Sequence, residues 1–395
     1  MRIGIVTAWF ERGAAYVSRQ YRDALERGGH EVFVYARGGE SYAVGDPNWD
    51  GPRVHWAARS LRSDRSGIVP SDFRGWLRRT RVSAVLFNEQ RTLGPVALCG
   101  RLGVKTVAYV DYYTKESVPG FAIYDGLVCN TRRHDSVFRW HPQSLYVPWG
   151  TDTGLFRPSE AWPDLVRPGL VTFFHSAGFS PDRKGTDLLI RAFDRVSSPS
   201  RLVVHAQKGV LRVFPRLEPV IERLRDGGRM ELIEETIPAP GAYCRGDVYV
   251  YPSRLDGIGL TVCEAMACGL PAVVPDEPPM NEFPAADCGA FVRVASREPR
   301  EDGYYWPMCN ADVESLAGTL EALAADPARV VGMKRAARER ALRERDWAAN
   351  GEAVVRFFES LRAAGDRDLR RANRRRRLSV FARDVARNVR SLLRR

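Results

Sequence analysis

A repeated alternation of short apolar segments with helical segments constrains the fold of this chain most strongly. The run IGIVTAWF precedes helical spacing over Ala14–Arg27, and a second apolar run, VFVYA, follows it. Near-continuous apolar runs are typical of parallel strands that are covered on both faces. Because Gly28 and Gly29 end the helical segment, the sequence predicts a strand–helix–strand unit. Further short apolar runs occur at Ala84–Phe87, Thr106–Val110 and Gly126–Cys129.

The alternation stops and then restarts, which predicts two α/β domains. The stretch YVPWGTDTGLFRPSEAWP, residues 146–163, has the proline and glycine content of a linker. After it, LVTFFHSAG, RLVVHA, MELIEE, DVYVYPS and LPAVVP are predicted strands, with helices over Gly185–Val196 and Leu260–Ala267. A length of 395 residues also fits two domains. We expect domains at 1–150 and 151–345, a closing helix at 346–365 and a tail at 366–395.

Composition places most of the positive charge in the tail. The chain has a net charge of +12, and residues 366–395, with 12 Arg and three Asp, carry +9 of it. The seven cysteines include no Cys-x-x-Cys pair, so we expect reduced thiols in a cytoplasmic protein rather than a disulfide framework or a zinc site. No apolar run is long enough to span a membrane, and MRIGIVTAWF reads as a first strand rather than a signal peptide.

The segment YPSRLDGIGLTVCEAMACGLPAVVP, residues 251–275, has the pattern of a ligand site. A strand runs into a loop with Gly257 and Gly259, and a helix follows that begins near Leu260. Open α/β sheets bind ligands at the carboxyl ends of their strands, and a helix N-terminus there suits a diphosphate. Glu264 on this helix can accept two hydrogen bonds from a ribose diol. Alternatively, Glu264 only complements the helix dipole.

The same segment resembles glycosyltransferase family 4, the retaining enzymes of the GT-B fold. The family pattern P-S-x-x-E-x-F-G-L-x-x-x-E-A-M-A-x-G-x-P-V-V reads here from Pro252-Ser253 to Val273-Val274. The resemblance implies two facing Rossmann-like domains with parallel sheets. It also implies that Glu264 binds the ribose and that Asp256, where the family has Glu, contacts the donor sugar. Gly257, Gly259 and Leu260 then border the nucleotide.

A second resemblance to the family lies in HSAGFSPDRKGTDLLIRAF, residues 175–193. A lysine in a loop before a helix acts as a point charge for phosphate, and a neighbouring arginine can donate two hydrogen bonds. We therefore predict that Lys184 and Arg183 neutralise the leaving diphosphate, with Gly178 bordering it. In the family an arginine directly follows the first glycine, whereas Phe179 does so here. A solvated Asp-Arg-Lys turn is the alternative.

The N-terminal half resembles the family more weakly. Gly13, in TAWFERGAAYV, stands where the family has a glycine-rich loop, and we expect it to approach the donor or the acceptor. The family's donor-contacting histidine has no counterpart in TVAYVDYYTKE, where Asp111 or a neighbouring tyrosine can substitute. His134 and His141 are expected to serve structure. The stretch Gly39–Thr80 matches no family motif, and an acceptor would be recognised there.

The resemblance implies transfer of a sugar from a nucleoside-diphosphate donor to a saccharide or lipid-linked acceptor, with retention of configuration. It implies no metal and no cofactor, because lysine, arginine and the helix dipole take the place of a cation. Another GT-B enzyme, such as an epimerase or a phosphorylase, and a non-catalytic nucleotide-sugar-binding protein are the alternatives.

The tail has the pattern of a basic amphipathic helix. Its apolar residues follow helical spacing between Leu378 and Leu393, and arginines occupy the rest of the helical wheel. Such a helix suits an anionic membrane surface, so we expect peripheral membrane contact through residues 370–395. Nucleic-acid binding is disfavoured because no aromatic residues interleave with the arginines. A tail that is flexible or bound to a partner protein is the third alternative.

Overall fold

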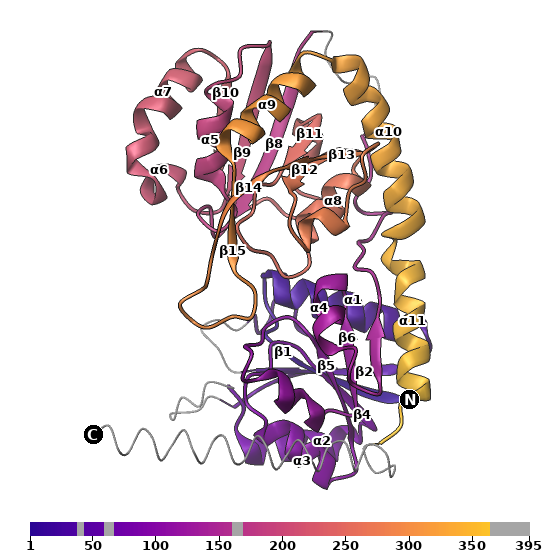
Figure 1. The fold of residues 1–395 in the computed structure, drawn as a ribbon. Coiled ribbons are helices and arrows are strands. Elements are labelled where there is room, and N and C mark those ends of the chain that lie inside the picture. Colours follow the sequence, from indigo (N-terminus) through magenta and orange to yellow (C-terminus); the bar gives the residue numbers. More distant parts are fainter. Residues whose placement is uncertain (38–42, 59–66, 160–168, 364–395) are drawn as a thin grey trace, which may run out of the picture. The chain divides into compact units, whose positions relative to one another are not determined.

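Two parallel sheets organise the computed structural model of the chain, which describes residues 1–37, 43–58, 67–159 and 169–363. The chain divides into two compact units (Figure 1). The first spans Met1–Val147 together with the C-terminal helix from Ala348, and the second spans Pro148–Trp347. The predicted basic helix of the tail lies outside the described residues, as do residues 38–42 and 59–66 of the stretch Gly39–Thr80. Within the described ranges, no helix has both the length and the apolarity needed to cross a membrane.

The first unit is a doubly wound domain. In its described residues, the strand order is β3-β2-β1-β4-β5-β6-β7, and every pairing is parallel. The strands are β1 Arg2–Thr7, β2 Glu31–Ala36, β3 Val54–Trp56, β4 Ala84–Phe87, β5 Lys105–Tyr109, β6 Gly126–Cys129 and β7 Ser144–Tyr146. The helices are α1 Gly13–Arg27, α2 Pro70–Thr80, α3 Gly94–Arg101, η1 Val118–Ile123, α4 Arg132–Phe138 and α11 Trp347–Ser360.

The helix α11 returns the chain to the first unit. Its apolar face buries Val354 and Phe358 completely, as the spacing of apolar residues predicts. Close packing fixes this contact, because a β-carbon on Gly28 would lie 2.6 Å from the side chain of Val355. The carbonyl oxygen of Leu361 accepts a hydrogen bond of 2.6 Å from Lys105 Nζ at the start of β5.

The second unit repeats the doubly wound plan. In the described residues its main sheet has the order β10-β9-β8-β11-β12-β13, all parallel, and β14 and β15 form a separate antiparallel hairpin. The strands are β8 Val171–Gly178, β9 Ser200–Ala206, β10 Met230–Glu234, β11 Val248–Val250, β12 Ala272–Pro275, β13 Gly289–Val292, β14 Val294–Glu298 and β15 Met308–Ala311. The helices are α5 Thr186–Phe193, α6 Val210–Val213, η2 Pro215–Leu217, α7 Glu218–Asp226, η3 Tyr243–Arg245, α8 Leu260–Ala267, η4 Met280–Glu282, α9 Val313–Ala324 and α10 Pro327–Glu344.

The predicted α/β class and parallel sheets are confirmed. Each apolar run named above forms a strand, because these residues pack between helices on both faces of a sheet. In each sheet the strand order reverses between the first strand and the fourth strand of its unit. These strands are β1 and β4 in the first unit, and β8 and β11 in the second. Such a switch point, at the carboxyl ends of the strands, is where ligands bind in open parallel sheets.

Candidate nucleotide site of the second unit

Two loops meet at the switch point of the second sheet. One joins β8 to α5 and the other joins β11 to α8, and the two strands are neighbours. Each helix begins directly after a glycine in the left-handed region, with φ of 70° at Gly185 and 60° at Gly259. Glycine adopts this conformation without steric cost. The local sequence therefore places two loops and the exposed N–H groups of α8 at one edge of the sheet.

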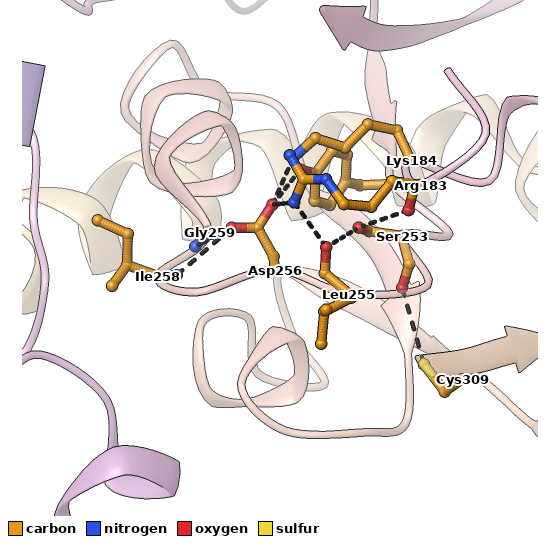
Figure 2. A network of polar contacts seen from close by, with 9 residues as sticks. Arg183, Lys184, Ser253, Leu255, Asp256, Ile258, Gly259 and Cys309 are labelled. Atoms are coloured by element: carbon orange, nitrogen blue, oxygen red, sulfur yellow. Dashed lines mark hydrogen bonds and ion pairs between the residues drawn. The ribbon is translucent and has the colours of Figure 1, made fainter. Parts of the chain in front are cut away.

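Hydrogen bonds fasten the two loops to each other (Figure 2). The Arg183 side chain donates to the carbonyl oxygen of Leu255 at 2.8 Å. The backbone N–H of Arg254 donates to the carbonyl oxygen of Arg183 at 2.9 Å. Contact is tight enough that a β-carbon on Gly185 would lie 2.1 Å from the carbonyl oxygen of Pro252. The loops therefore form one structural element, in which a shift of either displaces the other.

Lys184 and Asp256 form a shielded ion pair at the centre of this element. Their side chains are 13% and 12% exposed, and Lys184 Nζ contacts Asp256 Oδ2. The Tyr251 hydroxyl donates to the same oxygen at 2.5 Å and also contacts Lys184 Nζ. The other oxygen, Asp256 Oδ1, accepts the backbone N–H of Gly259 at 3.2 Å (Figure 2). Asp256 thus fixes the loop that leads into α8 while it neutralises the lysine.

The environment lowers the pKa values of both members of this pair. Burial, together with the charge of Arg183, lowers the pKa of Lys184 from 10.5 to about 8, although Asp256 acts against the shift. Burial alone would raise the pKa of Asp256, but Lys184 and Arg183 hold it well below its usual range. At neutral pH the pair is therefore ionised. The donors that converge on Asp256 are an ammonium group and the backbone N–H groups of the loop before α8. Donors of these kinds bind phosphate.

Glu264 lies on the second turn of α8, with its carboxylate accepting a hydrogen bond of 2.5 Å from the Tyr243 hydroxyl. Burial raises the pKa of Glu264 from 4.5 to about 7, and the bond from Tyr243 opposes this shift. A rise of 1.5 Å per residue places Glu264 about 6 Å along the axis from the start of α8 at Leu260. A diphosphate at the helix N-terminus would therefore leave the adjoining ribose beside Glu264.

The comparisons with known proteins point to one family. Residues 171–326 match the family model described as Glycosyl transferases group 1. This segment of the chain is therefore similar to the group 1 glycosyl transferases. A curated relative, the GDP-mannose-dependent alpha-(1-6)-phosphatidylinositol monomannoside mannosyltransferase of Mycolicibacterium smegmatis, is 28% identical over 240 residues. The monoacylated-substrate counterpart of Corynebacterium glutamicum is 24% identical over 246 residues.

These matches cover little more than half of each protein. They span 55% and 58% of this chain and 57% and 59% of the two relatives. Among solved structures, the sucrose-phosphate synthase of Thermosynechococcus elongatus superposes with a TM-score of 0.70 at 18% identity, covering 92% of this chain and all of that one. Anabaena HepE, solved with UDP and glucose, superposes with a TM-score of 0.69 at 13% identity, covering 91% of this chain and 99% of that one. The chain therefore has the GT-B fold of these glycosyltransferases.

The residues predicted for the donor site in the second unit come together. Lys184, Arg183 and Asp256 share one polar network, and Leu260 begins the helix that carries Glu264. The glycines Gly257 and Gly259 lie in the loop before α8, and Gly178 ends β8 with a φ of 54°. Gly13 is the first residue of α1 in the first unit.

Two tyrosines of the site were missed by sequence reasoning. Tyr251 joins Lys184 to Asp256, and Tyr243 joins η3 to Glu264. Tyr251 directly precedes the Pro-Ser pair, so its position at a strand end was a usable signal, whereas nothing near Tyr243 marks it. His175 was also left unassigned. It is fully buried between Val250 and Thr186, with its pKa lowered by burial to about 4, and it ties β8 to its neighbours.

The histidines discussed for the first unit have structural partners. His134 is buried and its Nδ1 lies 2.9 Å from the Tyr113 hydroxyl, while His141 Nε2 lies 3.1 Å from the carbonyl oxygen of Tyr124. Asp111 follows β5 at the carboxyl edge of the first sheet. Burial and the charge of Glu89 raise the pKa of Asp111 to about 7.

Proposed function

We propose that the chain is a glycosyltransferase that transfers a sugar from a nucleoside-diphosphate donor to a saccharide acceptor. One observation carries the proposal: Lys184, from the loop before α5, meets the loop that leads into α8, the helix that carries Glu264, at the switch point of the second sheet. The match of residues 171–326 to the group 1 glycosyl transferase model supports it. GDP-mannose is the first donor to test, because both curated relatives are named as GDP-mannose-dependent.

Each residue has a physical role in this proposal. Glu264, when ionised, accepts two hydrogen bonds from the ribose hydroxyls. The N–H groups at the start of α8 and the ammonium group of Lys184 bind the diphosphate. As the bond between sugar and phosphate breaks, negative charge grows on the leaving oxygen, and Lys184 with Arg183 stabilises it. Asp256 releases Lys184 to the diphosphate and turns toward the donor sugar.

The finer chemistry is also part of the proposal. The reaction retains the configuration at the sugar carbon, by attack of the acceptor on the face from which the diphosphate departs. The positive charge of Lys184 and Arg183 and the dipole of α8 serve where other enzymes use a metal ion, so no metal or other cofactor is needed. An acceptor linked to a lipid suits the relatives, which are named for phosphatidylinositol monomannoside substrates.

The experiment is a donor screen with purified chain. GDP-mannose, UDP-glucose and UDP-N-acetylglucosamine are incubated with and without saccharide acceptors, and release of nucleoside diphosphate is measured. We expect release with one donor class and its loss in Lys184→Ala and Glu264→Ala. The matched control is Lys208→Ala, since Lys208 is an exposed lysine directly beyond β9 at the same edge. Binding without turnover for every acceptor would instead indicate a non-catalytic binding protein.

Product analysis separates the remaining alternatives. Nuclear magnetic resonance of the product gives its anomeric configuration, and inversion would refute the retaining mechanism. Conversion of the sugar nucleotide without an acceptor would indicate an epimerase.

Peripheral attachment to an anionic membrane through residues 370–395 completes the proposal. Deletion of residues 366–395 should abolish binding to vesicles that contain anionic lipid, because about 1 kcal/mol of attraction is lost for each basic residue near the surface. Unchanged vesicle binding after the deletion would rule out this role.

A further inference from the structure

The switch point of the first sheet carries a second group of charged residues. The loop from β1 to α1 contributes Arg12, and the loop from β4 to α3 contributes Glu89. The two strands are neighbours at the point where the strand order reverses. The end of β2 adds Arg37 to the same edge, where its Nη1 donates to the carbonyl oxygen of Glu89 at 2.9 Å. This edge of a parallel sheet is the usual position for a ligand.

Glu89 adopts a backbone conformation that its side chain disfavours. Its φ is 51°, in the left-handed region, where a residue with a β-carbon is strained by roughly 1–2 kcal/mol. The surroundings hold it there. The bond from Arg37 fixes its carbonyl oxygen, and the neighbouring Asn88 is fully buried and donates to the carbonyl oxygen of Ala14 at 2.8 Å. Strain of this kind concentrates at functional sites, where a side chain must point in one direction.

The carboxylate of Glu89 lies between two guanidinium groups. Its Oε2 is 3.4 Å from Arg12 Nη2 and 3.9 Å from Arg37 Nη2. Arg91 and Asp111 lie close enough that both Arg91 and Glu89 influence the ionisation of Asp111. These five residues are the first-unit cluster. With three arginines and two carboxylates, the cluster has a net positive charge.

Part of the cluster is accessible. The side chains of Arg12 and Glu89 are 43% and 30% exposed, whereas that of Arg37 is only 11% exposed. Arg37 Nε is buried and makes no hydrogen bond to any residue in the described part of the chain. A ligand can therefore reach the Glu89 carboxylate and the Arg12 guanidinium at one place.

We propose that the first-unit cluster binds the acceptor and selects a saccharide that carries a phosphate group. This assignment rests on the proposed glycosyltransferase function. Glu89 accepts hydrogen bonds from sugar hydroxyls, which donate as readily as the N–H groups it now contacts. Arg12 donates to the phosphate, since a guanidinium matches phosphate oxygens in charge and geometry. Arg37 is a positioning residue that fixes the backbone of Glu89.

The test uses mannose 6-phosphate and mannose as acceptor-type probes for the full chain. A saturating concentration of GDP or UDP, whichever binds, occupies the second unit, and binding of each probe is followed by nuclear magnetic resonance titration. The sugar phosphate should bind about tenfold more tightly than mannose, and Arg12→Gln should remove that preference, because one charge-assisted contact is worth about a factor of ten. Affinity for mannose should change less than about twofold in this variant.

A second variant separates binding from structure. Asparagine tolerates the left-handed region, so Glu89→Asn should raise the melting temperature. The same variant should bind both mannose 6-phosphate and mannose about fivefold more weakly, or weaker still. Glu31→Gln is the matched control, because it removes a carboxylate 3.5 Å from Arg2 at the opposite edge of the sheet and should leave probe binding unchanged. A lower melting temperature with unchanged binding in Glu89→Asn would overturn the assignment, as would equal affinity of the wild type for both probes. Failure of the wild type to bind any nucleoside diphosphate overturns the proposed function and the acceptor assignment with it.

Discussion

Replacement of Glu264 by glutamine should stabilise the second unit at alkaline pH and weaken nucleotide binding. The carboxyl group is held where burial raises its pKa from 4.5 to about 7. The folded state therefore binds this proton more tightly than the unfolded state does. The resulting stabilisation is complete below pH 4.5 and is lost as the pH rises through about 7. Above that pH the folded protein keeps a carboxylate that glutamine would replace by a neutral group.

The size of the effect follows from the two pKa values. A difference of one pKa unit corresponds to 1.36 kcal/mol. The ionised carboxylate therefore lowers the free energy of unfolding by about 3 kcal/mol at pH 8 and above. Partial exposure of the side chain reduces this to about 2 kcal/mol. The amide oxygen of glutamine still accepts the hydrogen bond from Tyr243. For a unit of this size the melting temperature should rise by about 4–8 °C at pH 8 and by almost nothing at pH 5.

The assay is calorimetry of wild type and Glu264→Gln at both pH values, with nucleoside diphosphate titrated into each protein. The exposed Glu222 on α7 provides the matched control. Glu222→Gln also removes one carboxylate, but outside the site, and should leave the melting temperature unchanged at both pH values. An equal change in melting temperature at pH 5 and pH 8 would refute the reasoning, and so would a less stable variant at pH 8. Unchanged nucleotide affinity would remove Glu264 from the site.

Three further predictions follow from the same geometry. Gly185→Ala should destabilise the second unit by about 2–4 kcal/mol in denaturant titrations, because its methyl group would meet the backbone of the other loop at a φ of 70°. Asp256→Asn should bind nucleoside diphosphate about tenfold more tightly by calorimetry, since Lys184 loses a competing anion, yet transfer sugar more slowly. The pH profile of kcat/KM should be bell-shaped with its maximum between about 7 and 8, because Glu264 must be ionised and Lys184 protonated.

Local sequence was enough to predict the strands and the loop glycines of the second unit. Apolar runs bounded by glycine can form only a limited set of structures, and the helix from Leu260 begins where Gly259 allows a left-handed turn. The contacts of the site were not predictable in the same way. Lys184 and Tyr251 are 67 residues apart, and Tyr243 and Glu264 are 21 apart, so only the fold brings them together.

Other features had weaker signals or none. The hairpin β14–β15 follows β13 without the regular alternation that marks a strand, so it escaped prediction. The helix α10 carries an Asp326-Pro327 start that is a usable signal. The left-handed conformation of Glu89 has no sequence signal, because glutamate rarely adopts it and neighbouring contacts impose it.

The nucleotide site of the second unit is the central claim, and a crystal structure with bound GDP or UDP tests it most directly. We predict the diphosphate within hydrogen-bonding distance of Lys184 Nζ and of the backbone N–H of Gly259, with both ribose hydroxyls on Glu264. The ion pair between Lys184 and Asp256 should be broken in that complex. A nucleotide bound elsewhere, with the Lys184–Asp256 pair intact, would contradict the account.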